Sequence, residues 1–433
     1  METLTSDQSV GERMRADWNA RAREDAHYYV AFGRRDQDDS EFLSTAADVI
    51  RDLEGELKRL PAYIPLSSRR ALEIGCGPGR LMRPMSRHFA GIHGVDVSDE
   101  MIAQAQTKLK DIPWAKAHHA GGSDLAEFPA DHFDFVYSYA VFQHIPSAEV
   151  VFSYLRETVR VLKPGGFARL QMNGLPKTAR AYTTWEGVRI GSEEIHQFTR
   201  DHGIRLLSLT GVDTQYMWTT WQKPPAPPET TATNAPRIRH VVNAFSGEQA
   251  VPSTGRLACA TLQIEHLPVA CDLNSLEAFV DGVAGMVCYV GPPVNGLSQV
   301  NVFLPPGVRT GLVPVRINRH GQQLCPDTTI RIIPAGPAVP RLISLTDGVN
   351  LLSVQRIENG MMKATIEEVD SIDSLAATVD GRSVRNIDTF RTDPLASRYE
   401  VNFDMPEGLD AGPHILEIRL GRRTLTRTGI EVV

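Results

Sequence analysis

The segment at residues 71–80, ALEIGCGPGR, most constrains what this chain can fold into. A short apolar run leads into three glycines at alternate positions, Gly75, Gly77 and Gly79, and the stretch RLMRPMSRHF follows with a helical pattern. Glycine is favoured where the backbone takes a positive φ or where another group comes very near it. A turn of this kind also exposes backbone N–H groups beside a helix N-terminus. The segment therefore predicts a strand–turn–helix unit whose turn can hold a ligand.

Short apolar runs alternate with helical stretches from about residue 70 to residue 223. The expected strands are ALEIG, GIHGVDV, FDFVYSY and FARLQMN, and the expected helices are RLMRPMSRHF, DEMIAQAQTKL and SAEVVFSYLRETVRVL. This alternation is typical of βαβ units with a parallel sheet. The region ends with IRLLSLTG and TQYMWTTWQK, which we expect to pair as antiparallel strands at the sheet edge. Trp218 and Trp221, in the last of these strands, are expected to pack.

Residues 1–66 are expected to form a helical extension. Apolar residues recur there at spacings of three and four, which places them on one helix face: Leu43, Ala46, Ile50, Leu53, Leu57 and Leu60. Ser40 is the expected N-cap, and Pro61 marks the expected end of the helix. The stripe is too short for a coiled coil. We interpret it as a helix that packs on the domain that follows.

A proline-rich stretch separates this region from the rest of the chain. PPAPPETTATNAP, from Pro224 to Pro236, predicts a stiff, exposed linker. After it, helical periodicity gives way to short alternating strands and turn residues, which favours an all-β sandwich. We expect domain bounds at 67–223 for the α/β domain, 224–238 for the linker, and 239–337 and 338–433 for two β modules.

An internal repeat supports the division into two modules. VNVFLPPGVRTG, which begins at Val300, returns as VNFDMPEGLDAG at Val401, and SLEAFVDG at Ser275 returns as SLAATVDG at Ser374. The repeat length of about a hundred residues suits one sandwich domain per copy. The join is expected within PAGPAVP, between residues 334 and 340.

Composition narrows the functional classes. The net charge of −7 argues against general nucleic-acid binding, which normally shows a basic face. No run approaches the ~18 apolar residues of a membrane-spanning helix, and the N-terminal residues show no apolar signal-peptide region. The five cysteines contain no CxxC pair, so neither a zinc site nor a disulfide framework is expected. We therefore expect a cytoplasmic protein without a membrane span.

Three further motifs follow the glycines in order. GIHGVDVS ends its strand at Asp96, about 20 residues after Gly75, where an acid can accept hydrogen bonds from both hydroxyls of a ribose. GGSDL carries Asp124 just before the next strand, where a carboxylate can accept from an adenine amino group. A Lys-Pro-Gly-Gly turn, in LKPGG, then joins a helix to a further strand.

In this order, LEIGCGPGR, GVDVS, GGSDL, FDFVYSYAVFQHI and LKPGG resemble the class I S-adenosylmethionine-dependent methyltransferases, and the small-molecule type is the closest likeness. The resemblance covers about residues 70–223. It implies a Rossmann-like, seven-stranded α/β domain with the last strand antiparallel, and S-adenosyl-L-methionine lying across the carboxyl ends of the strands. Carried over, the cofactor-binding residues are Glu73, Gly75, Cys76, Gly77 and Gly79 at the methionine end, Asp96 at the ribose, Val97, Met101, Asp124 and Leu125 at the adenine, and Ser138 and Tyr139 near the methyl group.

Few residues are candidates for chemistry beyond cofactor binding. His144, in VFQHIP, follows the fourth expected strand and can serve as a base for a hydroxyl acceptor, because the ordinary pKa of histidine suits proton transfer near neutral pH. The other interpretation is a packing residue at a helix start. Trp18, Tyr28 and Tyr29 form either an aromatic lid over the cofactor or an anchor for the N-terminal extension. Cys76 is interpreted as a small filler, and no metal site is expected.

Other readings of the glycine motif fit less well. A dinucleotide-dependent dehydrogenase needs glycine at the position that Arg80 occupies. A protein or nucleobase-type amino methyltransferase lacks support because SYAV stands where an NPPY-type tetrapeptide is expected.

The β modules resemble immunoglobulin-like domains of the IPT/TIG kind, for which a scaffolding role is expected. The resemblance as a whole implies methyl transfer to an oxygen, or less readily a nitrogen, of a small molecule or glycan. The alternative is a cofactor-sensing binding protein whose β modules carry the function. Assembly into a homo-oligomer through the β modules is a further hypothesis.

Overall fold

A computed structural model describes residues 9–31, 35–60, 64–225, 234–348, 354–358, 360–393 and 396–433. The chain divides into two compact units. One unit contains Leu43–Ala335 together with the chain up to Ala26, and the other contains His27–Phe42 together with Gly336–Val433. No helix of the described residues is long and apolar enough to cross a membrane.

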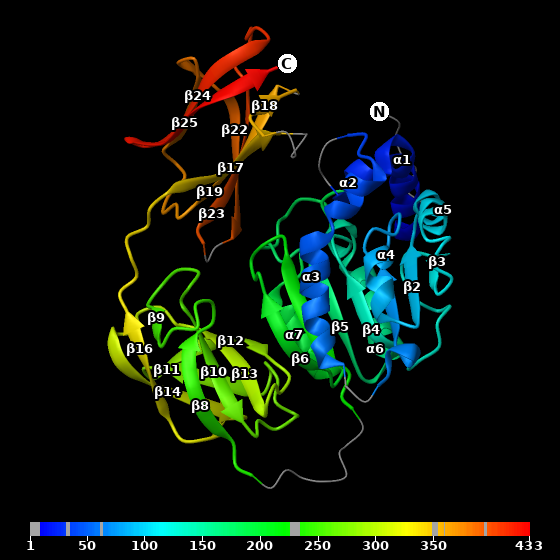
Figure 1. The fold of residues 1–433 in the computed structure, drawn as a ribbon, viewed down its shortest axis with the longest axis vertical. Helices are drawn as coiled ribbons and strands as arrows, with labels where there is room; N and C mark the ends of the chain where they lie inside the picture. Colours follow the sequence, from blue (N-terminus) through cyan, green and yellow to red (C-terminus); the bar gives the residue numbers. More distant parts are fainter. Residues whose placement is uncertain are drawn as a thin grey trace. The chain divides into compact units, whose positions relative to one another are not determined.

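The first unit contains a mixed sheet with helices between its strands (Figure 1). Its strands are β1 Arg70–Ile74, β2 Gly91–Asp96, β3 Ala115–His119, β4 Phe133–Ser138, β5 Leu162–Met172, β6 Arg205–Thr210 and β7 Met217–Gln222, in the order β3-β2-β1-β4-β5-β7-β6. The first five strands pair in parallel, and β7 is antiparallel to both β5 and β6. The Rossmann-like alternation predicted from the sequence is confirmed.

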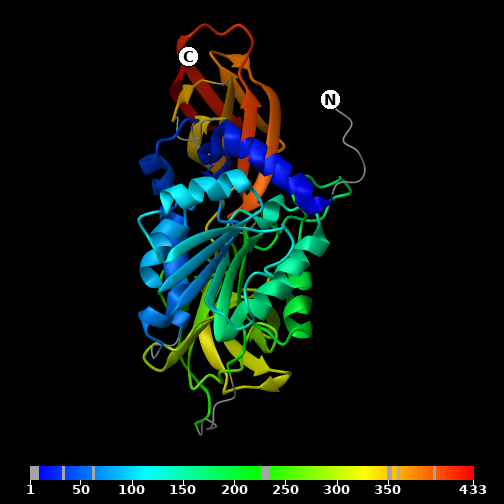
Figure 2. The ribbon, with the colours of Figure 1, turned by 90° about the vertical axis from the view of Figure 1, so that its right-hand side faces the viewer.

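Helices cover both faces of this sheet, as the edge-on view in Figure 2 shows. The helices are α4 Met82–Met85, α5 Asp99–Lys108, α6 Ala148–Val161 and α7 Ser192–Asp201. Helix α4 is shorter than the predicted helix and continues as the 3-10 turn η3 Ser86–His88. Serine side chains cap two of these helices: the Ser98 hydroxyl accepts from the backbone N–H of Met101 before α5, and the Ser147 hydroxyl accepts from that of Val150 before α6.

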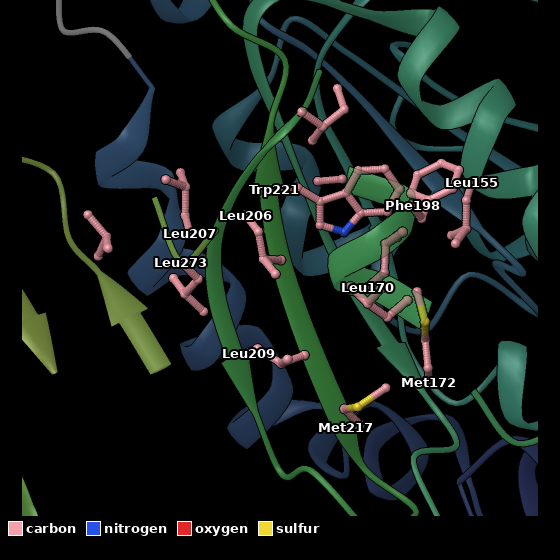
Figure 3. Packing of buried hydrophobic residues seen from close by; sticks show 14 of the residues in the cluster. Leu155, Leu170, Met172, Phe198, Leu206, Leu207, Leu209, Met217, Trp221 and Leu273 are labelled. Atoms are coloured by element: carbon pink, nitrogen blue, oxygen red, sulfur yellow. The ribbon is translucent and has the colours of Figure 1, made fainter. Parts of the chain in front are cut away.

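The core on the α6–α7 face is built around Trp221 (Figure 3). This tryptophan is fully buried, its indole meets the Phe198 ring edge to face at 5.5 Å, and its Nε1 donates to the Thr219 hydroxyl. Leucine and methionine side chains from β5, β6, β7 and α6 surround it. The packing role predicted for Trp221 is confirmed. Trp218 lies three positions earlier on the strand and takes part in a different cluster, described with the site.

The N-terminal extension forms α1 Val10–Ala31, interrupted by non-helical backbone at Asp25, then α2 Asp39–Ser44, α3 Ala47–Glu56 and the 3-10 turn η1 Leu57–Arg59. A further 3-10 turn, η2 Leu66–Ser68, precedes β1. The Ser40 prediction is wrong, because Ser40 lies inside α2. Asp38 and Glu41 cap that helix reciprocally, each side chain accepting the other's backbone N–H. Pro61 lies outside the described residues.

Five of the six residues of the apolar stripe pack together as predicted. Ala46, Ile50, Leu53 and Leu60 are buried in one cluster with side chains of α4 and α5, and Leu57 packs against that cluster. Leu43, the one stripe residue in α2, is not a member of this cluster.

Strands follow the linker in the first unit: β8 Arg237–Asn243, β9 Ala250–Pro252, β10 Cys259–Glu265, β11 Leu276–Val280, β12 Val283–Val290, β13 Leu297–Phe303, β14 Gly311–Arg319, β15 Gln322–Gln323 and β16 Thr328–Ile333. They are joined to the α/β sheet, since Tyr289 of β12 pairs with Ser208 of β6. The Leu273 N–H also donates to the Leu206 carbonyl at 2.8 Å. The prediction that β6 and β7 form the sheet edge is therefore wrong, because β12 covers β6.

The second unit contains β17 Arg341–Asp347, β18 Arg356–Ile357, β19 Met361–Glu367, β20 Leu375–Val379, β21 Arg382–Ser383, β22 Arg385–Asp393, β23 Arg398–Asp404, β24 Gly412–Leu420 and β25 Arg423–Val432. They form two sheets, ordered β17-β19-β23-β22 and β18-β25-β24-β20-β21. Both sheets contribute side chains to one apolar core, which includes Phe403 and Leu416.

The sequence repeat is also a structural repeat. Asp281 and Gly282 both have positive φ, 55° and 78°, in the turn after β11, and Asp380 and Gly381 have 49° and 77° in the turn after β20. Two consecutive positive φ values are the mark of a tight hairpin turn in which Asp-Gly is favoured. Strands β14 and β24, which pair with β11 and β20, both begin at a glycine. The two copies therefore share local structure as well as sequence.

Candidate active site

The glycine turn after β1 has the backbone predicted from the sequence. Gly75, Gly77 and Gly79 have φ of 71°, 50° and 83°. A Cβ atom on Gly75 would come within 2.2 Å of a methyl carbon of Val141, so any other residue would have to displace this side chain. The N–H groups of Gly75 and Cys76 donate to the Val95 carbonyl at 2.8 and 3.0 Å, which ties the turn to β2.

Asp96, at the end of β2, holds the same turn from the other side. Its Oδ2 accepts from the Gly77 N–H at 2.9 Å, and its Oδ1 accepts from the Ser98 N–H at 2.9 Å. Burial raises the pKa of this carboxyl. Each carboxylate oxygen can accept more than one hydrogen bond, so both retain capacity for a ribose hydroxyl.

Glu73, on β1, is a buried acid directly behind the turn. It is 3% exposed, and its Oε2 accepts a hydrogen bond from the Tyr137 hydroxyl at 2.9 Å. Burial raises its pKa to about 8, against the smaller opposing effects of the Tyr137 hydrogen bond and the Arg80 guanidinium. An ammonium group arriving here would favour the charged carboxylate. The site can therefore bind a cationic amine while releasing a proton.

Two of the predicted adenine residues, Asp124 and Leu125, lie in the segment between β3 and β4. Asp124 is exposed, and its Oδ1 accepts from the Ala126 N–H at 3.2 Å. Leu125 is buried, and its N–H donates to Glu157 Oε2 at 3.1 Å. The Asp124 carboxylate therefore faces solvent with lone pairs to spare.

Helix α1 packs against the end of β2 and the start of α5. The Asn19 Oδ1 accepts from the Ser98 hydroxyl at 2.6 Å, and Arg15 donates to Asp99 at 2.7 Å. Of the two other predicted adenine residues, Met101 is buried and Val97 is half-buried. A Cβ atom on Gly122 would lie 3.0 Å from Val97 and 3.2 Å from Met14 of α1. Close packing therefore joins α1 to the residues that are predicted to surround the adenine.

Trp18 connects α1 to His144. The two rings meet edge to face at 5.3 Å. The Arg21 guanidinium lies 4.8 Å from the Trp18 ring centre and 5.2 Å from that of Trp185, and it donates to the Thr184 hydroxyl at 3.2 Å. These contacts link α1 to the segment between β5 and α7. Sequence reasoning missed Arg21 and Trp185, because nothing local marks a contact across 160 residues.

Tyr28 and Tyr29 belong to the second unit. Their rings meet edge to face at 5.2 Å, and the Arg35 guanidinium lies 4.4 Å from the Tyr28 ring centre. The role of these two residues in a lid stays a prediction.

His144 ends the 3-10 turn η4 Phe142–His144. Its Nδ1 lies 2.8 Å from the Trp185 carbonyl oxygen, which only accepts, so Nδ1 carries the hydrogen. Its Nε2 lies 3.3 Å from the Gln143 amide nitrogen. Burial lowers the pKa of His144 to about 4, below the ordinary value on which the base prediction rests. At neutral pH the imidazole is neutral with a lone pair on Nε2.

Gln171, on β5, is a site residue that sequence reasoning missed. It is fully buried, its Oε1 accepts from the Ala140 N–H at 2.9 Å, and its Nε2 donates to Gln143 Oε1 at 3.2 Å and to the Gln215 carbonyl at 2.7 Å. One amide thus joins the loops after β4 and after β6. A lone glutamine in the apolar stretch FARLQMN is the available signal, because a buried amide must find partners.

The two residues predicted to lie near the methyl group differ in their surroundings. The Ser138 hydroxyl is buried and donates to the Ile74 carbonyl at 2.8 Å, so it joins β4 to β1. Tyr139 stacks on Trp218 at 5.6 Å with an interplanar angle of 7°. The packing prediction for Trp218 therefore misses that this residue lies beside a predicted site residue.

Cys76 has the surroundings of a small filler. It is 2% exposed, its Sγ lies 3.6 Å from the Gly77 carbonyl oxygen, and burial raises its pKa well above the ordinary value. Within the described residues, no group of three or more histidine, cysteine, aspartate or glutamate side chains could hold a metal ion.

The chain is similar to known methyltransferases over part of its length. The sequence profile of the family described as "Methyltransferase domain" matches residues 72–170. The ubiquinone biosynthesis O-methyltransferase of Coxiella burnetii is 24% identical over 175 residues, which cover 36% of this chain and 72% of the relative. The trans-aconitate 2-methyltransferase of Azoarcus sp. is 30% identical over 138 residues, which cover 31% of this chain and 50% of the relative.

Two solved structures are similar at lower identity. The magnesium protoporphyrin IX methyltransferase of Synechocystis, with bound cofactor, is 18% identical, covers 51% of this chain and 100% of its own, and has a TM-score of 0.37. The [4+2]-cyclase SpnF is 16% identical, covers 51% and 98%, and has a TM-score of 0.39. At these scores neither structure bears on the activity of this chain. The matched family and the site residues together lead to one conclusion: residues 72–170 form a methyltransferase domain whose cofactor is S-adenosylmethionine.

Proposed function

We propose that this chain transfers a methyl group from S-adenosylmethionine to an oxygen atom of a small molecule or a glycan. The observation that carries the proposal is Asp96, whose two carboxylate oxygens accept from the glycine turn and from the start of α5 and still have lone pairs for two hydroxyls. The name of the Coxiella burnetii relative, an O-methyltransferase, supports an oxygen acceptor.

The residues around the turn suit the chemical groups of the cofactor. When bound, S-adenosylmethionine supplies an activated methyl group that carries its own leaving group. Glu73 and the turn from Gly75 to Gly79, which includes Cys76, would hold the amino-acid end. Asp96 would hold the ribose, and the adenine would lie among Val97, Met101, Asp124 and Leu125. These assignments combine one buried acid, one acid that holds the turn, and apolar side chains near an exposed acid.

His144 is the proposed general base. Its Nε2 lone pair can take the proton of an acceptor hydroxyl once the Gln143 amide turns away, and the Trp185 carbonyl holds the Nδ1 hydrogen and stabilises the imidazolium that forms. The edge-to-face contact with Trp18 fixes the plane of the ring. In this proposal α1 both covers the site and orients the base.

For the strand-rich regions after the linker we propose an immunoglobulin-like fold and a scaffolding role. Such modules could form a dimer, dock a partner or hold a long acceptor. The joined strands β6 and β12 support at least one structural function, which is to extend the catalytic sheet.

The test is label transfer into a fractionated cell extract. The full chain is incubated with methyl-labelled S-adenosylmethionine and with glycan, protein and small-molecule fractions. An Asp96→Asn variant is the blank. Asp131→Asn is the matched control, because Asp131 is an exposed acid whose carboxylate is paired with Lys223. We expect label in the small-molecule or glycan fraction, as an O-methyl group, from the wild type and the control alone. Label confined to protein, or to nitrogen atoms, would contradict the proposal.

A further inference from the structure

Three aromatic side chains lie together at the predicted methyl end of the site. The Tyr139 ring lies 5.6 Å from that of Trp218 with an interplanar angle of 7°, and 6.4 Å from that of Tyr216 with an angle of 22°. The three planes are thus nearly parallel. Trp218 is half-buried, and Tyr216 is 44% exposed. We call these three residues the aromatic platform.

The platform lies at the edge of the sheet where the parallel strands have their carboxyl ends. Tyr139 directly follows β4, the neighbour of β1 in the sheet. Trp218 pairs with Gln171, near the carboxyl end of β5, and Tyr216 immediately precedes β7. Ligands of open α/β sheets bind at this edge, and the glycine turn and Asp96 lie at the same ends of β1 and β2.

The backbone around the platform is fixed in place. The Thr214 hydroxyl donates to the Gly211 carbonyl at 2.7 Å, and the Tyr216 N–H donates to the Thr214 hydroxyl at 3.2 Å. Gly211 has φ of 67°, and a Cβ atom there would come within 2.4 Å of the Tyr216 carbonyl oxygen. Gln171 holds the same turn through the Gln215 carbonyl. A platform held this way loses little conformational entropy when a ring stacks on it.

Two guanidinium groups lie near the platform rings. That of Arg169 is 4.6 Å from the Trp218 ring centre, and that of Arg80 is 5.8 Å from the Tyr139 ring centre. Asp52 accepts two hydrogen bonds of 3.1 Å from Arg169, which hold this guanidinium in place. A cation near an aromatic ring attracts the π electrons of that ring. The ring then stacks more favourably on a partner ring that is rich in electrons. Hydroxyl groups make an aromatic ring rich in this way.

We propose that the aromatic platform binds the methyl acceptor, and that the acceptor is a hydroxylated aromatic ring stacked parallel to Tyr139, Trp218 and Tyr216. The inference rests on the proposed function and names its substrate class. The phenolic oxygen gains the methyl group and loses its proton to His144 or to water, while S-adenosylhomocysteine leaves with the electron pair of the broken carbon–sulfur bond. An aliphatic sugar ring gains less from a parallel π stack, so it is the competing acceptor in the test.

The test compares two acceptor probes of similar size, catechol and cyclohexane-1,2-diol, with an unfractionated small-molecule extract as a third arm. The full chain receives methyl-labelled S-adenosylmethionine. We expect label in catechol and in aromatic compounds of the extract, and none in the diol. The Trp218→Leu and Tyr216→Leu variants should raise KM for catechol about tenfold. The Trp218→Phe and Tyr216→Phe variants keep a ring and should stay within about threefold of the wild type. The cofactor Kd should not change.

The possible results distinguish a failure of the aromatic acceptor from a failure of the proposed methyl transfer. Label that enters only non-aromatic compounds overturns the aromatic acceptor while methyl transfer stands. Leucine variants with the wild-type KM and kcat overturn the platform in the same way. Absence of label from every arm, with the cofactor bound, contradicts the proposed function itself and the inference with it.

Discussion

Glu73 and Asp96 show how single residues in this site combine local sequence with burial. Both acids could be predicted as site residues from the sequence, because one lies beside the glycine turn and the other at a strand end. The pKa of Glu73, about 8, could not be assigned in this way, because it arises from burial of the carboxyl in the folded chain. The sequence identifies the group, and the tertiary structure sets its charge.

Cofactor binding should depend on pH through Glu73. In the free protein this carboxyl has a pKa of about 8, and an ammonium group beside it would lower that pKa. Binding then releases a proton, so the affinity for S-adenosylmethionine should rise as the pH increases from 6 toward about 8 and then level off. Titration calorimetry in buffers of different ionisation heat measures both effects. An affinity that stays flat over this range would contradict the assignment.

The Glu73→Gln variant should separate binding from stability. The pKa of Glu73 is about 8 in the folded chain and 4.5 in the unfolded chain. Between these values the folded chain binds more protons, so the free energy of unfolding decreases as the pH rises from 4.5 toward 8. Glutamine does not titrate, so the Glu73→Gln variant does not lose this stability. The variant should therefore bind cofactor more weakly but resist urea better than the wild type at pH 8, with little difference at pH 5. Glu149→Gln, at an exposed position of α6, is the control.

His144 should act without the pH profile of an ordinary histidine. Because its pKa is about 4, the imidazole stays neutral above pH 5, and kcat should show no inflection between pH 6 and 7. His144→Asn can still donate to the Trp185 carbonyl but lacks the basic nitrogen. We expect kcat to fall about 100-fold with cofactor Kd unchanged. Near-normal turnover by this variant would contradict the role of His144 as a base and would favour a packing role.

At the scale of single elements, local patterns were reliable where one helix or strand carries the signal. The βα alternation follows from such patterns. The Ser40 prediction failed because a capping pair three residues apart, Asp38 and Glu41, begins α2 earlier. The prediction that β6 lies at the sheet edge was wrong for a different reason: β12, the strand that pairs with β6, lies about 80 residues later in the chain. Gln171 was missed because its partners lie on two separate loops, after β4 and after β6.

Strands β2 and β3 carry a histidine pair that should make the fold sensitive to acid. The His93 Nδ1 lies 3.0 Å from the His118 Nε2, so one ring donates to the other while both are neutral. Burial, followed by the neighbouring His118 and His132, lowers the pKa of His93 to about 4. Between pH 6.5 and about 4 the unfolded chain therefore binds more protons than the folded chain, and stability should fall as the pH drops through this range.

The His93→Leu variant tests this element. It should lose less stability than the wild type between pH 7 and pH 5, measured as the shift of the urea midpoint. His240→Leu, at an exposed position of β8, should behave as the wild type does. An equal acid shift in wild type and His93→Leu would show that other groups cause the acid sensitivity.

At the scale of the whole molecule, the sequence predicted two repeated β modules, and the repeated Asp-Gly turns of β11 and β20 bear out the repeat. It did not predict that strands of the first module continue the α/β sheet. That join depends on a few long-range contacts, such as Arg59 donating to the Val290 carbonyl at 2.9 Å. No periodicity or turn signal encodes such contacts.

Truncation should show that the first β region stabilises the catalytic domain. A chain ending at residue 223 exposes the backbone of β6 and the side chains around Leu206, and an exposed strand edge favours aggregation. We expect its Tm to be lower than that of the full chain by about 5 °C or more, with aggregation on heating. A chain ending at residue 335, the limit of the first unit, should keep β6 covered. Equal Tm and solubility for the two truncations would contradict this role.

The central claim is that the site around Asp96 supports turnover and not only cofactor binding. The most direct measurement is the formation of S-adenosylhomocysteine by the full chain, with and without cell extract, with cofactor binding followed in the same samples. We predict product only when extract is present, full activity in Asp131→Asn, and a loss of both binding and turnover in Asp96→Asn. Tight, Asp96-dependent binding without any product would contradict the claim and leave a protein that senses the cofactor.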